Sequence, residues 1–181
     1  MGIDLSEYSD IVLEHALDQA ARHDLPELHF LTVCEKRKSS TDECKQALWE
    51  RVHPALETFN QFGTEWRARL HVRRGKPDQQ IGALAADINA DLIVVGNFGL
   101  HNPRSKYKNL PNGVLYAAVC PVFVVGTPPE LDTKQCPACH NTRELTDCDR
   151  WFCDKHHARA DYATTPMTVW TGGRYAIDKA A

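Results

Sequence analysis

The residues best suited to chemistry in this sequence are cysteines and a histidine gathered toward its C-terminal end. Cys136 and Cys139 bracket two residues in "CPAC", a spacing that lets two thiolates share one tetrahedral ion. Cys153 and His156 repeat the same spacing in "CDKH". Together these four residues predict a structural zinc site, because a closed shell of four protein ligands leaves no open position for a substrate.

Cys148 leaves the choice of ligands open. It could replace His156, which would make an all-cysteine set with Cys136, Cys139 and Cys153. The set with His156 implies a treble-clef arrangement of knuckle, hairpin and helix, and the all-cysteine set implies a zinc ribbon. A redox dithiol at Cys136 and Cys139 is a third reading. We do not expect it, because such motifs usually begin a helix that leaves a strand.

Two aromatic residues, Trp151 and Phe152, lie directly before Cys153. So short a segment can bury little else. We therefore expect this aromatic pair to form the small core of the zinc module.

The composition bounds the class of protein. At 181 residues, with 43% hydrophobic residues, the chain predicts one globular domain and a small appendage. The net charge of -3 argues against a nucleic-acid partner, because that affinity depends on clustered Lys and Arg. We find no apolar run of the roughly 18 residues that span a membrane and no signal segment, and so expect a cytoplasmic protein without a membrane partner. Cytoplasmic cysteines are expected to be thiols or metal ligands rather than disulfides.

Helices and strands alternate along the first two thirds of the chain. Apolar periodicity predicts helices over 6–23, 40–62 and 76–90, a short helix that 115–119 completes, and strands over 28–35, 65–75, 91–96 and 121–126. This rhythm predicts an α/β fold with a doubly wound parallel sheet, in which 65–75 is an edge strand. We place the α/β domain at 1–127, and a linker, the zinc-binding module and a tail at 128–181.

Three segments, "GIDLSEYSDIVLEHAL", "RRGKPDQQIGALAADINADLIVVG" and "AAVCPVFVVG", resemble the universal stress protein (UspA-like) family. The resemblance implies a flavodoxin-like sheet of five strands and a homodimer joined through the last strand, here Pro121 to Gly126. In that family several apolar residues precede the aspartate that matches Asp4, whereas this sequence offers only Met1, Gly2 and Ile3. We therefore expect a stunted first strand, and a true start of the chain that lies upstream.

The resemblance also implies a place for an adenine nucleotide, ATP or AMP, held by Asp4, Val33, Gly96 and Gly99. Nucleotide-binding members carry Gly, two residues, Gly, nine residues, Gly and then Ser or Thr. Gly96 and Gly99 match the first half, but Asn109 replaces the third glycine in one counting register and the hydroxyl residue in the other. Asparagine tolerates a left-handed backbone and caps helices, so Asn109 stays a candidate. We expect degraded or absent ATP binding.

These features predict a stress-response regulatory or binding protein whose zinc module is an interaction surface for a protein partner. The sequence has no nucleophile elbow and no Lys after a phosphate loop, so we expect no enzyme beyond slow ATP hydrolysis. Two alternatives stay open. One is an adenine-nucleotide-binding universal stress protein. The other is a nucleic-acid-binding zinc protein, which the lack of a basic stripe in residues 136–157 disfavours.

Overall fold

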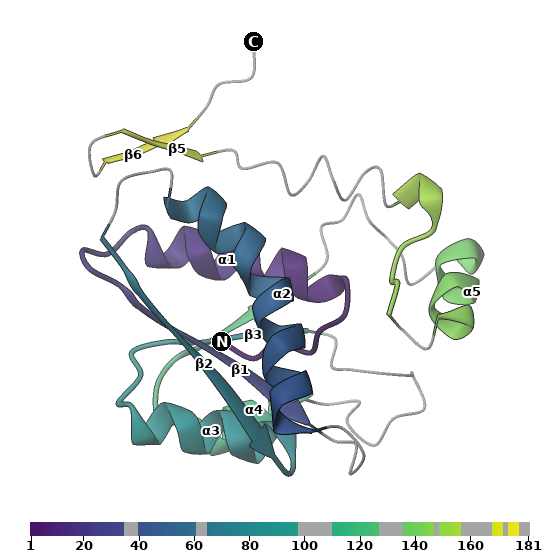
Figure 1. Cartoon of the computed structure of the whole chain (residues 1–181), viewed down its shortest axis with the longest axis horizontal. Coiled ribbons are helices and arrows are strands. Elements are labelled where there is room, and N and C mark those ends of the chain that lie inside the picture. Colours follow the sequence, from purple (N-terminus) through teal and green to yellow (C-terminus); the bar gives the residue numbers. More distant parts are fainter. Residues whose placement is uncertain are drawn as a thin grey trace.

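A computed structural model describes residues 1–34, 40–60, 65–97, 110–126, 136–146 and 149–156, together with the backbone of 168–171 and 174–177. Its helices are α1 (Tyr8–Ala20), α2 (Thr41–Asn60), α3 (Pro77–Asp87), α4 (Leu110–Ala117) and α5 (Pro137–Leu145). Its strands are β1 (Glu27–Cys34), β2 (Arg67–Arg74), β3 (Ile93–Gly96), β4 (Val122–Val125), β5 (Thr168–Thr171) and β6 (Arg174–Ile177). Figure 1 shows their arrangement.

The sheet is parallel and has the chain's first residues at its centre. β1 pairs with β2, and β3 pairs with β4, in both cases in parallel. Residues 1–3 join the two pairs: the Gly2 N–H donates to the Val94 carbonyl at 3.1 Å, and the Ile3 N–H donates to the Leu31 carbonyl at 2.8 Å. The first strand is thus reduced to a single bridge between Gly2 and Leu31. The predicted parallel α/β fold is confirmed, with the stunted first strand in the middle.

Helices cover both faces of this sheet. Figure 1 shows α1 and α2 on one face and α3 and α4 on the other. Apolar side chains of α2 such as Leu48 and Val52 are fully buried against β1, while Ile81 and Leu84 of α3 pack on the opposite face. Within the described residues β2 pairs only with β1, so the edge position expected for 65–75 is confirmed.

Two elements differ from the sequence prediction. α4 begins at Leu110 and ends at Ala117, two residues before the predicted end at 119, and Pro111 and Gly113 lie in its first turns. Proline has no penalty there, since the first N–H groups of a helix lack intrahelical partners. The predicted tail contains β5 and β6, which form an antiparallel pair.

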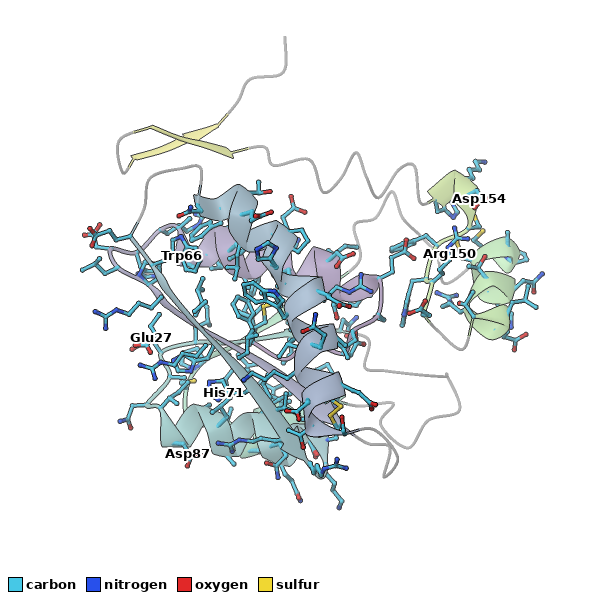
Figure 2. The ribbon with its side chains drawn as sticks, in the orientation of Figure 1. Glu27, Trp66, His71, Asp87, Arg150 and Asp154 are labelled. Carbon is cyan, nitrogen blue, oxygen red and sulfur yellow. A yellow bond between two sulfur atoms is a disulfide. The ribbon has the colours of Figure 1, made fainter. Side chains whose placement is uncertain are left out.

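Cys34 and Cys44 are joined by a disulfide, shown in Figure 2, with their Cα atoms 6.6 Å apart. The bond links the end of β1 to the first turns of α2. The expectation that cysteines outside the metal cluster are free thiols is therefore wrong for this pair. The sequence offered no signal for it, because the contact forms only when the strand and the helix pack.

In the described part of the chain, no helix combines the length and the apolar character that a bilayer span requires.

Candidate functional site

Four predicted zinc ligands come together in space. The Sγ atoms of Cys136, Cys139 and Cys153 and a ring nitrogen of His156 all lie within 4.8 Å of one another. The His156 Nδ1 lies 3.0 Å from the Cys139 Sγ and 3.6 Å from the Cys153 Sγ. In a tetrahedral zinc site with Zn–S near 2.3 Å and Zn–N near 2.0 Å, sulfur and nitrogen ligands are about 3.6 Å apart. The donor set and its spacing therefore fit one zinc ion.

Helix starts position both pairs of ligands. Cys136 is the N-cap of α5, Pro137 opens the helix, and Cys139 follows one turn later on the same side. Cys153 precedes a helical turn over 154–156 that carries His156. Three-residue offsets at the start of a helix place two side chains on one face, so each pair converges locally.

The electrostatics of the two cysteines in "CPAC" differ. The backbone N–H of Cys139 donates to the Cys136 sulfur and lowers the pKa of that half-buried thiol. Burial raises the pKa of the Cys139 thiol to about 12, although the Cys153 N–H donates to its sulfur at 3.3 Å. A bound cation would compensate the negative charge of a thiolate at Cys139, which burial otherwise disfavours.

The local architecture corrects two sequence interpretations. The hairpin predicted between the ligand pairs is wrong, since Pro137–Leu145 is a helix, and the treble-clef and ribbon arrangements are not formed over the described residues of the module. The dithiol interpretation requires a helix start that follows a strand: "CPAC" does begin α5, contrary to expectation, but the residues before it, 127–135, lie outside the described residues. Cys148, the competing ligand, lies outside the described residues.

The predicted core of the module packs elsewhere. Trp151 and Phe152 are buried in a cluster with Tyr8, Val94 and Val125, so they belong to the core of the α/β domain. They pack at the start of α1, where the ring centroids of Tyr8 and Trp151 are 5.4 Å apart. The expectation of a separate aromatic core is wrong, because these side chains find a larger apolar surface on the domain than the module can supply.

The ligand-bearing turn also carries its own ion pair. Arg150 Nη2 lies 3.1 Å from Asp154 Oδ1, across Cys153 in the chain, and Figure 2 shows both side chains on the module. The pair is exposed, so its contribution to stability is small.

The predicted nucleotide residues lie at the carboxyl ends of the strands, where α/β folds bind ligands. Asp4 follows the stunted strand, and its Oδ1 accepts hydrogen bonds from the Ser6 N–H at 3.0 Å and from the Ser6 and Ser9 hydroxyls at 2.6 Å each. Its Oδ2 is buried and has no partner among the described residues. One oxygen thus orders the turn into α1, and the other is left for a further donor.

Val33 and Gly96 have structural roles of their own. Val33 is 8% exposed and packs in the core on the α3 side. A Cβ at Gly96 would come within 2.6 Å of the Tyr8 ring, whose hydroxyl donates to the Val125 carbonyl at 2.6 Å. Glycine at position 96 is therefore explained by the close approach of Tyr8. The other two predicted nucleotide residues, Gly99 and Asn109, lie outside the described residues.

The Asp78 carboxylate lies beside the start of α4. A Cβ at Gly113 would lie 2.7 Å from the Asp78 Oδ2, so this glycine allows the acidic side chain of α3 to approach the helix. A helix N-terminus attracts anions. Asp78 places a negative charge where a phosphate group would otherwise be favoured.

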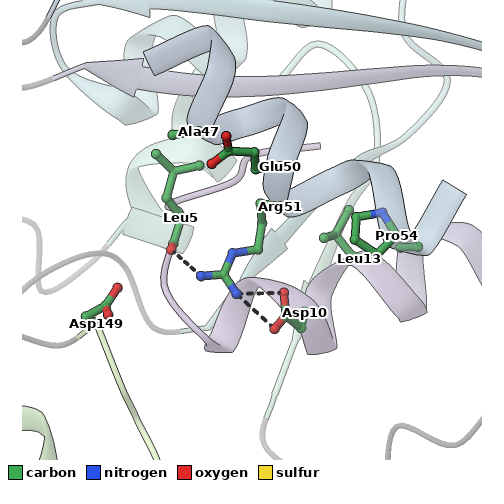
Figure 3. A pocket seen from close by; sticks show the side chains of 9 residues that line it. Leu5, Asp10, Leu13, Ala47, Glu50, Arg51, Pro54 and Asp149 are labelled. Atoms are coloured by element: carbon green, nitrogen blue, oxygen red, sulfur yellow. Dashed lines mark hydrogen bonds and ion pairs between the residues drawn. The ribbon is translucent and has the colours of Figure 1, made fainter. Parts of the chain in front are cut away.

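A cavity of about 560 Å³ opens between α1, α2 and the C-terminal module (Figure 3). Its one arginine, Arg51, donates to both oxygens of Asp10 at 3.0 and 3.2 Å and to the Leu5 carbonyl at 2.9 Å. Burial raises the pKa of Asp10, with Arg51 opposing that shift. Because Asp10, Glu50 and Asp149 also line the cavity, its charge does not favour an anionic ligand.

Comparisons with known proteins agree with this geometry. The model of the universal stress protein family matches residues 1–126, and the chain belongs to that family. The Cys/His cluster lies beyond the matched residues. A solved universal stress protein in complex with cAMP is 24% identical, with 71% of this chain and 95% of that chain covered and a TM-score of 0.51. A universal stress protein from Archaeoglobus fulgidus is 20% identical, with 68% and 93% covered and a TM-score of 0.51. These likenesses show the fold. Among curated proteins no match is found.

Proposed function

We propose that this universal stress protein family member is a regulatory or binding protein whose Cys136, Cys139, Cys153 and His156 hold one structural zinc ion. The observation that carries the proposal is the convergence of these four ligand atoms within 4.8 Å. Zinc bound by three thiolates and an imidazole has no position left for water or substrate. The ion would therefore order the module rather than catalyse a reaction, and the protein would act by docking to a protein partner.

Two contacts support weak or absent ATP binding. Tyr8 fills the space next to Gly96, and Asp78 approaches Gly113 at the start of α4. The first contact fills space beside one of the predicted nucleotide residues, and the second places a carboxylate at the start of a helix, where it would repel a phosphate group. We propose that contacts within the protein occupy the carboxyl edge of the sheet, so that ATP binds there weakly or not at all.

Adenine-nucleotide binding is a second candidate function. It is favoured by the unpartnered, buried Oδ2 of Asp4 at the carboxyl edge. The solved relative in complex with cAMP has the same fold. Under this alternative the Asp4 carboxylate would accept a hydrogen bond from the ligand.

We also propose a homodimer formed through β4. In the described residues this strand pairs only with β3, which leaves its other edge open. Exposed apolar side chains lie nearby on and after α4, with Tyr116 94% and Val119 63% exposed. An unpaired strand edge beside apolar surface is suited to a second copy of the chain.

Native mass spectrometry of protein purified without added ligand tests these proposals together. The expected masses correspond to a dimer with one zinc ion per chain and no nucleotide. Protein without zinc would contradict the metal site, and a monomer would contradict the β4 interface. A mass increment of ATP, AMP or cAMP would favour the second candidate function, and titration calorimetry with Asp4→Ala would then compare the affinities.

A further inference from the structure

Glu7, the residue before α1, connects the Cys/His module to the α/β domain. Its Oε2 accepts hydrogen bonds from the Trp151 N–H at 2.7 Å and the Phe152 N–H at 3.3 Å. Its own N–H donates to the Asp149 carbonyl at 3.2 Å. Glu7 thus bonds to three backbone groups, those of residues 149, 151 and 152, just before a metal ligand.

The next residue along the chain from this contact is Cys153. Its N–H donates to the Cys139 Sγ, and its own Sγ lies 3.6 Å from the His156 ring. The direction and position of Cys153 are therefore set from one side by Glu7, through Phe152, and from the other by the remaining ligands. A carboxylate that accepts two N–H groups is a strong acceptor, since charge-assisted hydrogen bonds are roughly twice as strong as neutral ones.

The side chains reinforce the backbone contact. Phe152 is 1% exposed and Trp151 is 7% exposed, both in the cluster that includes Tyr8. Tyr8 in turn closes over Gly96 at the carboxyl edge. Residues 149–153 are therefore connected by packed side chains to the start of α1 and to that edge.

We propose that Glu7 is a positioning residue for the metal ligand Cys153, and that metal loading locks residues 149–153 onto the start of α1. This inference rests on the zinc site proposed above. It makes the metal site and the family domain one cooperative unit, instead of a domain with an independent appendage. Partners that each support a metal ligand from outside its coordination shell typically change metal affinity by about 10- to 100-fold.

The test uses the full chain with Zn²⁺ as the probe. Zinc affinity is measured by competition with a chromophoric chelator, and amide hydrogen exchange is followed in peptides covering residues 5–12 and 149–153, with and without zinc. In the wild type, zinc is expected to slow exchange in both peptides. Glu7→Ala is expected to bind one zinc about 10- to 100-fold more weakly and to lose the zinc-dependent protection of residues 5–12.

Glu7→Gln keeps an oxygen acceptor without the charge and is expected to recover part of both effects. Glu65→Gln, an exposed carboxylate distant in sequence, serves as the control and should match the wild type. Because Glu7→Gln preserves the shape of the side chain, it decides the question if Glu7→Ala fails to fold. Wild-type zinc affinity in both Glu7 variants, or zinc binding that leaves residues 5–12 unchanged, would overturn this inference alone. Failure to bind zinc at all would overturn the proposed metal site together with it.

Discussion

Short motifs predict a binding site both at the Cys/His cluster and at the carboxyl edge of the sheet. The two regions differ in whether the predicted residues converge on a site for a ligand. At the cluster, two pairs with three-residue offsets converge from separate helix starts into one donor set. At the edge, Asp4, Val33 and Gly96 reach the expected end of the sheet, but each is engaged in contacts within the protein.

The difference follows from what each motif encodes. Metal-ligand spacing is a local property, because a helical turn alone brings residues i and i+3 together. A nucleotide-binding loop needs space for the ligand and backbone N–H groups that have no partner in the protein. Both requirements depend on which side chains from other parts of the chain pack nearby. Here Tyr8, which the sequence marked only as part of a helix, stands beside Gly96.

Replacing a metal ligand should have the largest effect. Cys139→Ser is expected to abolish zinc binding and to lower the free energy of unfolding by more than about 3 kcal/mol, because binding energy of a structural zinc is folding energy. Native mass spectrometry and urea unfolding measure the two effects. Cys120→Ser removes a half-buried cysteine outside the cluster and should retain one zinc. Equal zinc content in both variants would show that the Cys/His cluster is not the zinc site.

Removing the disulfide near the carboxyl edge of the sheet should have the next largest effect. Cys44→Ser opens the Cys34–Cys44 link, which spans 10 residues of sequence beside Val33. Loop-closure entropy predicts a loss of about 2–3 kcal/mol in the free energy of unfolding. Guanidinium unfolding measures the loss, again with Cys120→Ser as the control. Alkylation of both cysteines in native, non-reduced protein would show that the link is absent under those conditions.

Gly96→Ala distinguishes packing from ligand binding at the edge. The new Cβ would meet the Tyr8 ring at 2.6 Å. Overpacking of this kind costs about 1–3 kcal/mol of stability. Gly126→Ala, whose Cβ would have no heavy atom within 4 Å, should change stability little. If Gly96→Ala left the thermal midpoint unchanged but altered ATP affinity in calorimetry, the assignment of this glycine to packing would be wrong.

The smallest effect concerns α1, the helix that both regions contact. Burial raises the pKa of Glu14 from its usual value to about 7. The folded state therefore holds this proton more tightly than the unfolded state, and stability should fall as pH rises from about 4.5 to 7. Glu14→Gln should remove that slope and be more stable at pH 8 by on the order of 1 kcal/mol, after allowance for solvent screening. Thermal unfolding at several pH values measures it, with the exposed Glu65→Gln expected to keep the wild-type slope.

Much of the fold could be predicted from sequence because its signals are periodic. Buried runs such as Ile93–Gly96 and amphipathic helices such as Pro77–Asp87 carry their burial pattern in residue order. The sequence did not predict where α4 starts, because Pro111 and Gly113 in its first turns have low helix propensity. The Glu7 contact joins residues more than 140 positions apart, and the Cys34–Cys44 link joins a strand to the following helix, so no local pattern marks either of them.

By itself, the sequence determined the alternation of helices and strands, the membership of residues 1–126 in the universal stress protein family, and the two pairs of candidate metal ligands. These depend on periodicity and on short offsets, which survive in residue order. Only the tertiary structure decided that Trp151 and Phe152 pack on α1, and that Tyr8 closes on Gly96. The physical reason is that burial of large apolar side chains is non-directional, so it selects whichever surface the whole fold makes available.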